Sequence, residues 1–251
     1  MEPVAYDTIA QAQRDHFWFR GRRAIFESIL KDTFEKSRQS GEKPRILEVG
    51  CGPGGMLPLV ERFGDVHALD ISFESMEQCR DSGYPKVVAG SGLDLPYKDQ
   101  SFDMVCLFDT IEHIPEDQKV LEEARRILKP GGVVFVSVPA YQFLFSQNDR
   151  LVHHQRRYTK AMLRERFAGA GLAPKKLTYF NTFLFPLILP AVMMVKAKEK
   201  IVGLPEGQTN LSHSFFKPIH DVFAWFMGSE KHLIRHMEFP FGHSLVGVAT
   251  A

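Results

Sequence analysis

Residues 45–55, with the sequence RILEVGCGPGG, constrain the fold of this chain more than any other segment. Residues 46–49 are apolar apart from Glu48, which predicts a buried parallel strand over 45–49. The glycines that follow, at positions 50, 52, 54 and 55, predict a sharp turn that opens a helix over 55–63. Glycine lacks a Cβ, so the backbone N–H groups of such a turn can approach a ligand closely. This order of strand, turn and helix indicates a nucleotide-cofactor site.

The glycine loop is compatible with two classes of cofactor. Gly50, Gly52 and Gly55 satisfy the dinucleotide pattern G-x-G-x-x-G, and Asp70 follows about 20 residues later. On this pattern alone an NAD-linked oxidoreductase stays open. Glu48 argues against it, because a carboxylate two residues before the first glycine repels a pyrophosphate. It suits a cofactor that carries positive charge, such as S-adenosylmethionine with its sulfonium and amino groups.

Five stretches, in order along the chain, resemble the class I S-adenosylmethionine-dependent methyltransferases. They are EVGCGPG over 48–54, VHALD over 66–70, DLPYKDQSFD over 94–103, FDTIEH over 108–113 and LKPGG over 128–132. The first is similar to the family's E-x-G-x-G-x-G signature, and the second to its strand with a ribose-binding acid. The resemblance implies S-adenosylmethionine as the cofactor and S-adenosylhomocysteine as the product.

The expected fold is α/β, with a Rossmann-like, doubly wound sheet of seven strands whose last strand is antiparallel. We expect three regions: an N-terminal helical lid or cap over 1–44, a cofactor-binding core over 45–180, and an aromatic-rich insertion with a final strand over 181–251. Alternating strand and helix patterns support the core. Strands are predicted near 45–49, 66–70, 86–89, 103–108, 132–138, 174–180 and 244–250, and helices near 55–63, 73–82, 116–128 and 159–170.

The resemblance assigns the methionine and ribose contacts. It implies that Gly50, Gly52 and Gly54 pass the backbone against the methionine portion, and that Glu48 or nearby backbone holds its charged groups. Asp70 is expected to accept hydrogen bonds from both ribose hydroxyls, as ionised carboxylates do well. A helix N-cap is the purely structural alternative for Asp70.

The adenine contacts are less defined. Ile71 is expected to pack against the adenine edge. Many members of the family carry an aspartate where this chain has Ser91, so the choice among Ser91, Gly92 and Leu93 stays open. Phe108 and Asp109 end a predicted strand, where ligands bind in such sheets, and are expected in the site.

Methyl transfer depends mainly on positioning, because the sulfonium is already a good leaving group. A general base helps only where the acceptor must lose a proton. The candidates are His113, His154 and Tyr158, with surface or capping roles as the alternative. Residues 153–159, HHQRRYT, form an unusually polar run whose arginines and histidines suit a phosphate or carboxylate, or else a solvated loop. No local spacing suits a metal, so none is predicted.

The flanking regions are expected to determine the substrate. Residues 16–23, HFWFRGRR, suit either a lid or an anchor for a helix. The apolar stretch 183–195, FLFPLILPAVMMV, is shorter than the about 20 residues that span a bilayer. It suits a buried helix, the wall of an apolar pocket, a homodimer surface, or a peripheral membrane contact beside the lysines that follow. The chain has 21 phenylalanines, which favours a bulky hydrophobic acceptor.

We therefore expect a methyltransferase that acts on a small or lipid-like, hydrophobic acceptor, with oxygen favoured over nitrogen or carbon. A catalytically silent S-adenosylmethionine-binding subunit with a regulatory or assembly role is the alternative. The net charge of +1 provides no overall field for nucleic acid, so no nucleic-acid partner is expected. Three cysteines without metal or redox spacing, and no visible secretory signal, predict a cytoplasmic location, with membrane-peripheral contact as a variant.

Overall fold

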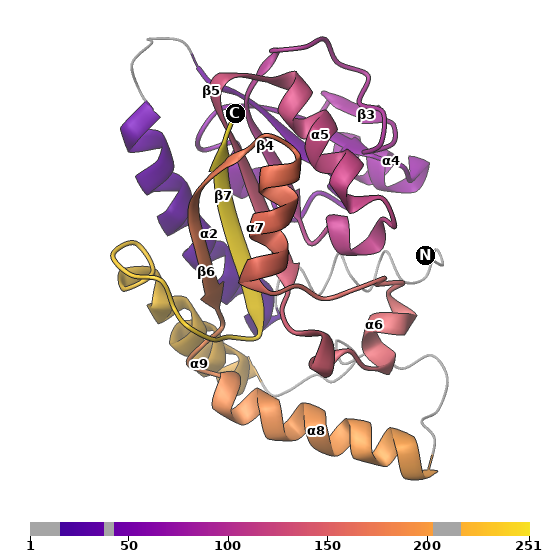
Figure 1. Ribbon diagram of the computed structural model, residues 1–251, viewed down its shortest axis with the longest axis vertical. Coiled ribbons are helices and arrows are strands. Elements are labelled where there is room, and N and C mark those ends of the chain that lie inside the picture. Colours follow the sequence, from indigo (N-terminus) through magenta and orange to yellow (C-terminus); the bar gives the residue numbers. More distant parts are fainter. Residues whose placement is uncertain (1–15, 38–42, 203–216) are drawn as a thin grey trace.

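The computed structural model describes residues 16–37, 43–202 and 217–251 (Figure 1). Its sheet has seven strands in the order β3-β2-β1-β4-β5-β7-β6. The strands are β1 Arg45–Val49, β2 Asp65–Asp70, β3 Val87–Ala89, β4 Phe102–Phe108, β5 Leu128–Pro139, β6 Ala173–Phe180 and β7 Ser244–Thr250. Only β7 runs antiparallel to its neighbours. This confirms the predicted doubly wound sheet and its antiparallel last strand.

The helices agree with the expected alternation and add several elements outside it. They are α2 Phe17–Ser37, α3 Leu57–Val60, α4 Phe73–Asp81, α5 Asp117–Ile127, α6 Gln147–Leu151, α7 Lys160–Gly169, α8 Phe185–Val202 and α9 Lys217–Gly228, with short 3₁₀ turns η1 Ile111–His113, η2 Gln142–Leu144 and η4 Ser229–His232. Within the predicted N-terminal lid over 1–44, residues 1–15 and 38–42 lie outside the described residues.

One helix is shorter than the sequence predicts. The expected helix over 55–63 is reduced to α3, because Gly54 has a φ of +81° and the turn continues to Met56. At its other end the chain returns sharply into β2 at Gly64, where a Cβ would lie 2.3 Å from the carbonyl oxygen of Pro44. The glycine turn therefore occupies more of this connection than the helix does.

Helices cover both faces of the sheet and bury one large apolar cluster, with a smaller second cluster around Cys79 beside β2 and α4. On one face Phe26 of α2 packs against Phe108, Phe135 and Phe180, with ring centroids 5.1 to 5.4 Å apart. On the other face α7 lies so close to β7 that a Cβ at Gly247 would meet Phe167 at 2.7 Å. Thr159 caps α7, and its hydroxyl accepts the N–H of Met162.

The C-terminal insertion lies at one end of the sheet. Figure 1 shows α8 and α9 beyond the end of the sheet at which β6 finishes. Burial of α8 was the first of the four roles that its sequence suggested, and it is not observed: Leu187 and Met194 are 63% and 73% exposed. Within the described ranges, no helix combines the length and the apolar character needed to cross a membrane.

Candidate active site

A cavity of about 1000 Å³ opens at the carboxyl ends of the parallel strands. The loops after β1, β2, β3 and β4 line one part of it, and the segment after β5 and one side of α8 line another. The first turns of α2, with Phe17, Trp18 and Arg22, also line the cavity. Open α/β sheets bind ligands at this edge, where neighbouring loops diverge. The residues predicted for the cofactor and those predicted for catalysis therefore share one cavity, with the two exceptions described below.

The glycine loop is held open by contacts with the next strand and with the loop after β4. The N–H groups of Gly50 and Cys51 both donate to the carbonyl of Leu69. Gly50 has a φ of +73°, and a Cβ there would lie 2.6 Å from Cγ2 of Thr110. Gly52 has a φ of +51°, and a Cβ there would meet no protein atom within 4 Å. Because Gly52 lines the cavity, this open space is available to a ligand.

Asp70 fixes the loop at the end of β2. Its two carboxylate oxygens accept the N–H groups of Gly52, at 2.7 Å, and Ser72, at 2.8 Å. The N-cap of α4 is Ser72 and not Asp70. Ile71 lines the cavity and is 82% exposed, and its packing against adenine stays a prediction.

The three candidates for adenine recognition lie together on the loop after β3. Ser91, Gly92 and Leu93 all line the cavity. The hydroxyl of Ser91 accepts the N–H of Leu93 at 3.2 Å, so its acceptor capacity is partly used within the turn.

Charged groups are buried beneath the glycine loop. Glu48 is 2% exposed, and its Oε2 has no hydrogen-bond partner among the described residues. Burial raises the pKa of Glu48 well above its usual range, and the charge of Arg22 opposes that rise. The guanidinium of Arg22 lies over the ring of Trp18 and pairs with Asp109. An unpartnered buried carboxylate oxygen that faces a cavity fits a ligand that carries positive charge.

Two predicted site residues do not line the cavity. Gly54 packs against Cys79, whose sulfur would lie 2.9 Å from a Cβ, so its role is to let the loop pack. The Sγ atoms of Cys51 and Cys79 are 3.9 Å apart here, and both cysteines are free. Tyr158 is fully buried, and its hydroxyl donates to Asp117 at 2.8 Å. Tyr158 therefore supports the fold through Asp117, and its hydroxyl does not reach the cavity as a catalytic residue would.

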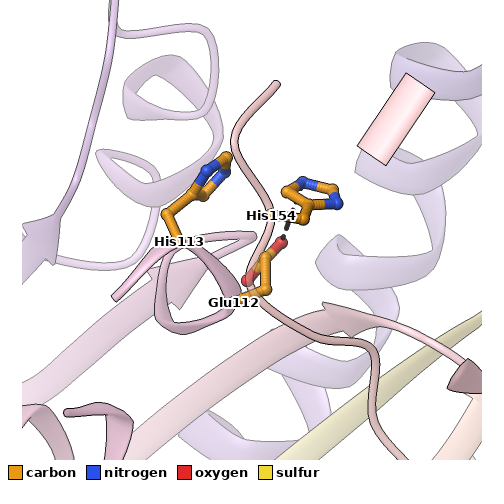
Figure 2. Close-up of side chains that lie close together, drawn as sticks. All are labelled: Glu112, His113 and His154. Carbon is orange, nitrogen blue, oxygen red and sulfur yellow. Dashed lines mark ion pairs between the residues drawn. The ribbon is translucent and has the colours of Figure 1, made fainter. Parts of the chain in front are cut away.

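The far part of the cavity brings together Glu112, His113 and His154 (Figure 2). The rings of the two histidines have centroids 4.6 Å apart, and Nε2 of His154 lies 3.9 Å from Oε1 of Glu112. Burial, together with the neighbouring His154, lowers the pKa of His113 to about 4. At neutral pH His113 is therefore uncharged. Local spacing predicted no metal site, because these side chains come from segments far apart in the sequence.

His154 is oriented by a buried aspartate that the sequence did not single out. Nδ1 of His154 lies 2.8 Å from Oδ1 of Asp149, which also accepts Nε of Arg157 at 2.8 Å. Burial opposes ionisation, but the bonds from His154 and Arg157 lower the pKa of Asp149 below its usual range. An ionised carboxylate only accepts, so Nδ1 of His154 carries a proton and donates it to Asp149.

The arginines of the 153–159 run are occupied within the protein. Arg156 donates to the carbonyls of Ile114 and Pro115 and pairs with Asp117, and Arg157 pairs with Asp149. The suggestion that these arginines bind a phosphate or carboxylate is therefore not supported by their contacts.

Two further cavity residues come from the last part of the chain. Asn181 is fully buried, and neither its Nδ2 nor its Oδ1 has a hydrogen-bond partner in the described part of the chain. Burial lowers the pKa of His243 to about 3, with the charge of Arg157 as a further cause. Neither residue belongs to a sequence motif, so only the fold reveals them.

Comparison with known proteins identifies the cofactor-binding part of the chain. Residues 47–136 match the family model described as a methyltransferase domain. A probable S-adenosylmethionine-dependent methyltransferase of Mycolicibacterium smegmatis is 31% identical over 135 residues, which are 53% of this chain and 49% of that protein. The 27-O-demethylrifamycin SV methyltransferase of Amycolatopsis mediterranei is 26% identical over 179 residues, 64% of each chain. The alignments thus span less than two thirds of these relatives' lengths.

Among solved structures, an S-adenosylmethionine-dependent methyltransferase of Thermotoga maritima superposes with a TM-score of 0.57 at 19% identity. The superposition covers 100% of this chain and 99% of the other. At this level of identity the likeness shows the fold alone.

Proposed function

We propose that this chain, which belongs to the class I S-adenosylmethionine-dependent methyltransferases, transfers a methyl group to an oxygen of a bulky, hydrophobic acceptor. The observation that carries the proposal is a single cavity that joins the glycine loop to the Glu112–His113–His154 cluster. S-adenosylmethionine, when bound, supplies the methyl group and a neutral leaving group. The protein then has to hold the two reactants in line and keep water out.

The glycine-loop end of the cavity fits the cofactor. Asp70 accepts the N–H of Gly52 and so fixes the loop. The space that a Cβ of Gly52 would occupy is open to a ligand. Glu48 offers the cationic methionine portion a buried oxygen that has no hydrogen-bond partner within the described ranges. Ile71 and the Ser91–Leu93 turn flank the remaining space, which fits the adenosine portion.

The other end of the cavity suits an apolar acceptor with one polar group. Ile188, Ala191, Val192 and Val195 of α8 contribute an aliphatic wall, in agreement with the pocket-wall role suggested for this stretch. Asn181 adds a buried amide whose Nδ2 and Oδ1 make no hydrogen bond to any described residue. A mostly apolar wall with a few polar groups is typical of small-molecule sites.

His154 is the side chain best prepared to take a proton from an acceptor hydroxyl. The carboxylate of Asp149 orients its ring and stabilises the imidazolium that would form, as in other carboxylate–histidine pairs. A hydroxyl acceptor has to lose its proton on methylation, so a base in this position supports oxygen over carbon as the methylated atom. The relative named for 27-O-demethylrifamycin acts on an oxygen of a large molecule, which also supports this choice.

Transfer of a tritiated methyl group tests the proposal. The purified chain would be incubated with labelled S-adenosylmethionine and a panel of apolar phenols, fatty acids and sterols, and label in the organic extract would be counted. We expect transfer to at least one compound, a large loss in His154→Asn, and little change in the neighbouring exposed variant His153→Asn. Cofactor binding without transfer to any compound would favour the catalytically silent subunit instead.

The outward side of α8 remains a separate question. Met193 and Met194 are exposed there, and Trp225 of α9 is 73% exposed. Contact of this surface with a membrane or with a second copy of the chain stays a prediction, as does the cytoplasmic location.

A further inference from the structure

Glu112 is a buried carboxylate whose side chain has no hydrogen-bond partner in the described part of the chain. It is fully buried in η1, and both of its side-chain oxygens lack a hydrogen-bond partner among the described residues. Nε2 of His154 approaches Oε1 only to 3.9 Å, which is too long for a hydrogen bond. An unpartnered buried polar group costs about 1–3 kcal/mol, and more when charged. A buried carboxylate at a cavity wall therefore indicates a ligand that the chain itself does not supply.

The two histidines beside Glu112 are arranged as metal ligands are. One ligand atom from each of Glu112, His113 and His154 lies within 4.8 Å of the others. Figure 2 shows the Glu112 carboxylate directed toward His154, with both imidazole rings on the same side of it. Two imidazoles and one carboxylate are a ligand set preferred by zinc and by other divalent first-row transition metals.

The surroundings of the histidines support this arrangement. Nδ1 of His154 is bound to the Asp149 carboxylate, which leaves Nε2 on the side of Glu112. The His113 ring is hydrogen-bonded to the backbone of Val152 and His153. Metal-binding histidines commonly donate their second ring nitrogen to a carboxylate or a carbonyl in this way. The N–H of Gln155 donates to the carbonyl of Glu112 at 2.7 Å, which fixes the two segments together.

We propose that Glu112, His113 and His154 bind one divalent transition-metal ion, with zinc as the representative, in the wall of the cavity. Ligand atoms about 2.0–2.2 Å from zinc lie roughly 3.3 Å apart, so the three side chains close by about 1.5 Å at most when the ion binds. Three protein ligands leave a coordination position open toward the cavity, as in catalytic zinc sites. The metal site is inferred from this geometry alone and does not depend on methyl transfer.

A role for the ion in catalysis does rest on the proposed function. With the ion bound, the histidines act as ligands, and an acceptor hydroxyl in the open position becomes more acidic. The hydroxyl would lose its proton to solvent before the methyl transfer. The new O–CH₃ bond would then form as the C–S bond breaks, and the electron pair of that bond would stay on sulfur. The ion thus replaces the general base assigned above to His154.

Zinc binding by the full chain tests the site without reference to activity. After treatment with a chelator, the protein would be titrated with Zn²⁺ by calorimetry at pH 7.5. We expect about one ion per chain, and a loss of affinity of at least about 100-fold in Glu112→Gln and in His154→Asn. His153→Asn is the matched control, because this exposed neighbour lines the same cavity and is not in the cluster. It should bind zinc as the wild type does.

Cobalt provides a second readout for any variant that folds poorly. Co²⁺ added to the wild type should give the visible absorption bands of a low-coordinate nitrogen and oxygen site, and added Zn²⁺ should remove them. A wild type with no stoichiometric zinc and no cobalt bands would overturn the proposal, as would equal zinc affinity in the His154→Asn and His153→Asn variants. Tight Mg²⁺ binding in place of Zn²⁺ would overturn the class of metal. If zinc binds but S-adenosylmethionine does not, the proposed function fails while the metal site stands.

Discussion

Gly52→Ala should separate cofactor binding from stability. Gly52 has a φ of +51°, so a Cβ there costs about 1–2 kcal/mol through its left-handed backbone. The substitution also lowers the conformational entropy of the unfolded chain, which stabilises the folded state by about 0.4–1 kcal/mol and offsets part of this cost. The net destabilisation is about 1 kcal/mol, or roughly 2–4 °C in Tm for a chain of this size.

The effect on affinity should be larger than the effect on stability. The added methyl meets no protein atom within 4 Å and occupies space at the cavity, where the cofactor is expected. We expect the Kd for S-adenosylhomocysteine to rise at least about tenfold, which corresponds to about 1.4 kcal/mol. Calorimetric titration measures the Kd, and thermal unfolding measures the stability.

Gly171→Ala is the matched control for this substitution. Gly171 follows α7 with a φ of +70°, a Cβ there also meets nothing within 4 Å, and the residue does not line the cavity. It should lose about the same stability as Gly52→Ala and bind S-adenosylhomocysteine with the affinity of the wild type. Unchanged affinity in Gly52→Ala would refute the placement of the cofactor on this loop.

Three further substitutions test roles that the structure assigns away from the loop. Tyr158→Phe removes the bond to Asp117 and should cost about 1–2 kcal/mol of unfolding free energy, measured with denaturant, while cofactor affinity and kcat stay the same; a large fall in kcat at unchanged stability would restore its catalytic role. For His243, the pKa of about 3 lies below that of the unfolded chain, so its contribution to stability is present above about pH 6.5 and is lost toward pH 3. The unfolding free energy of His243→Gln should therefore depend less on pH in this range, and an unchanged slope would contradict the burial of a neutral imidazole. For Glu230, burial raises the pKa to about 7, so the stability gained from its protonated form is present below about pH 4.5 and is lost as the pH rises toward 7. Glu230→Gln should gain stability relative to the wild type between pH 5 and 7, and a constant difference would count against this.

The cofactor half of the site could be predicted from the sequence because its parts are local. The strand, the glycines and Asp70 lie within one β–loop–α–β segment, and their spacing already places Asp70 beside the loop. The structure adds that Asp70 accepts the N–H of Gly52, and that Gly54 faces Cys79 instead of the cavity.

The other half could not be predicted, because long-range contacts assemble it. Glu112 and His154 meet only because β4 and β5 end side by side, and Asn181 arrives from β6. Asp149 carries no local signal, since its role depends on a buried contact with Arg157. Tyr158 looked catalytic because it stands in a polar run, but its side chain points into the core. The sequence of α8 left its role open, because an apolar run does not indicate which side meets the cavity.

Binding of S-adenosylhomocysteine, S-adenosylmethionine and NAD to the wild type and to Asp70→Ala, measured by calorimetry, tests the central claim most directly. We expect the first two to bind at micromolar strength, NAD not to bind, and the variant to lose affinity for both. Binding of NAD without binding of S-adenosylmethionine would contradict the assignment of Glu48 and of the whole cavity to a methyl donor.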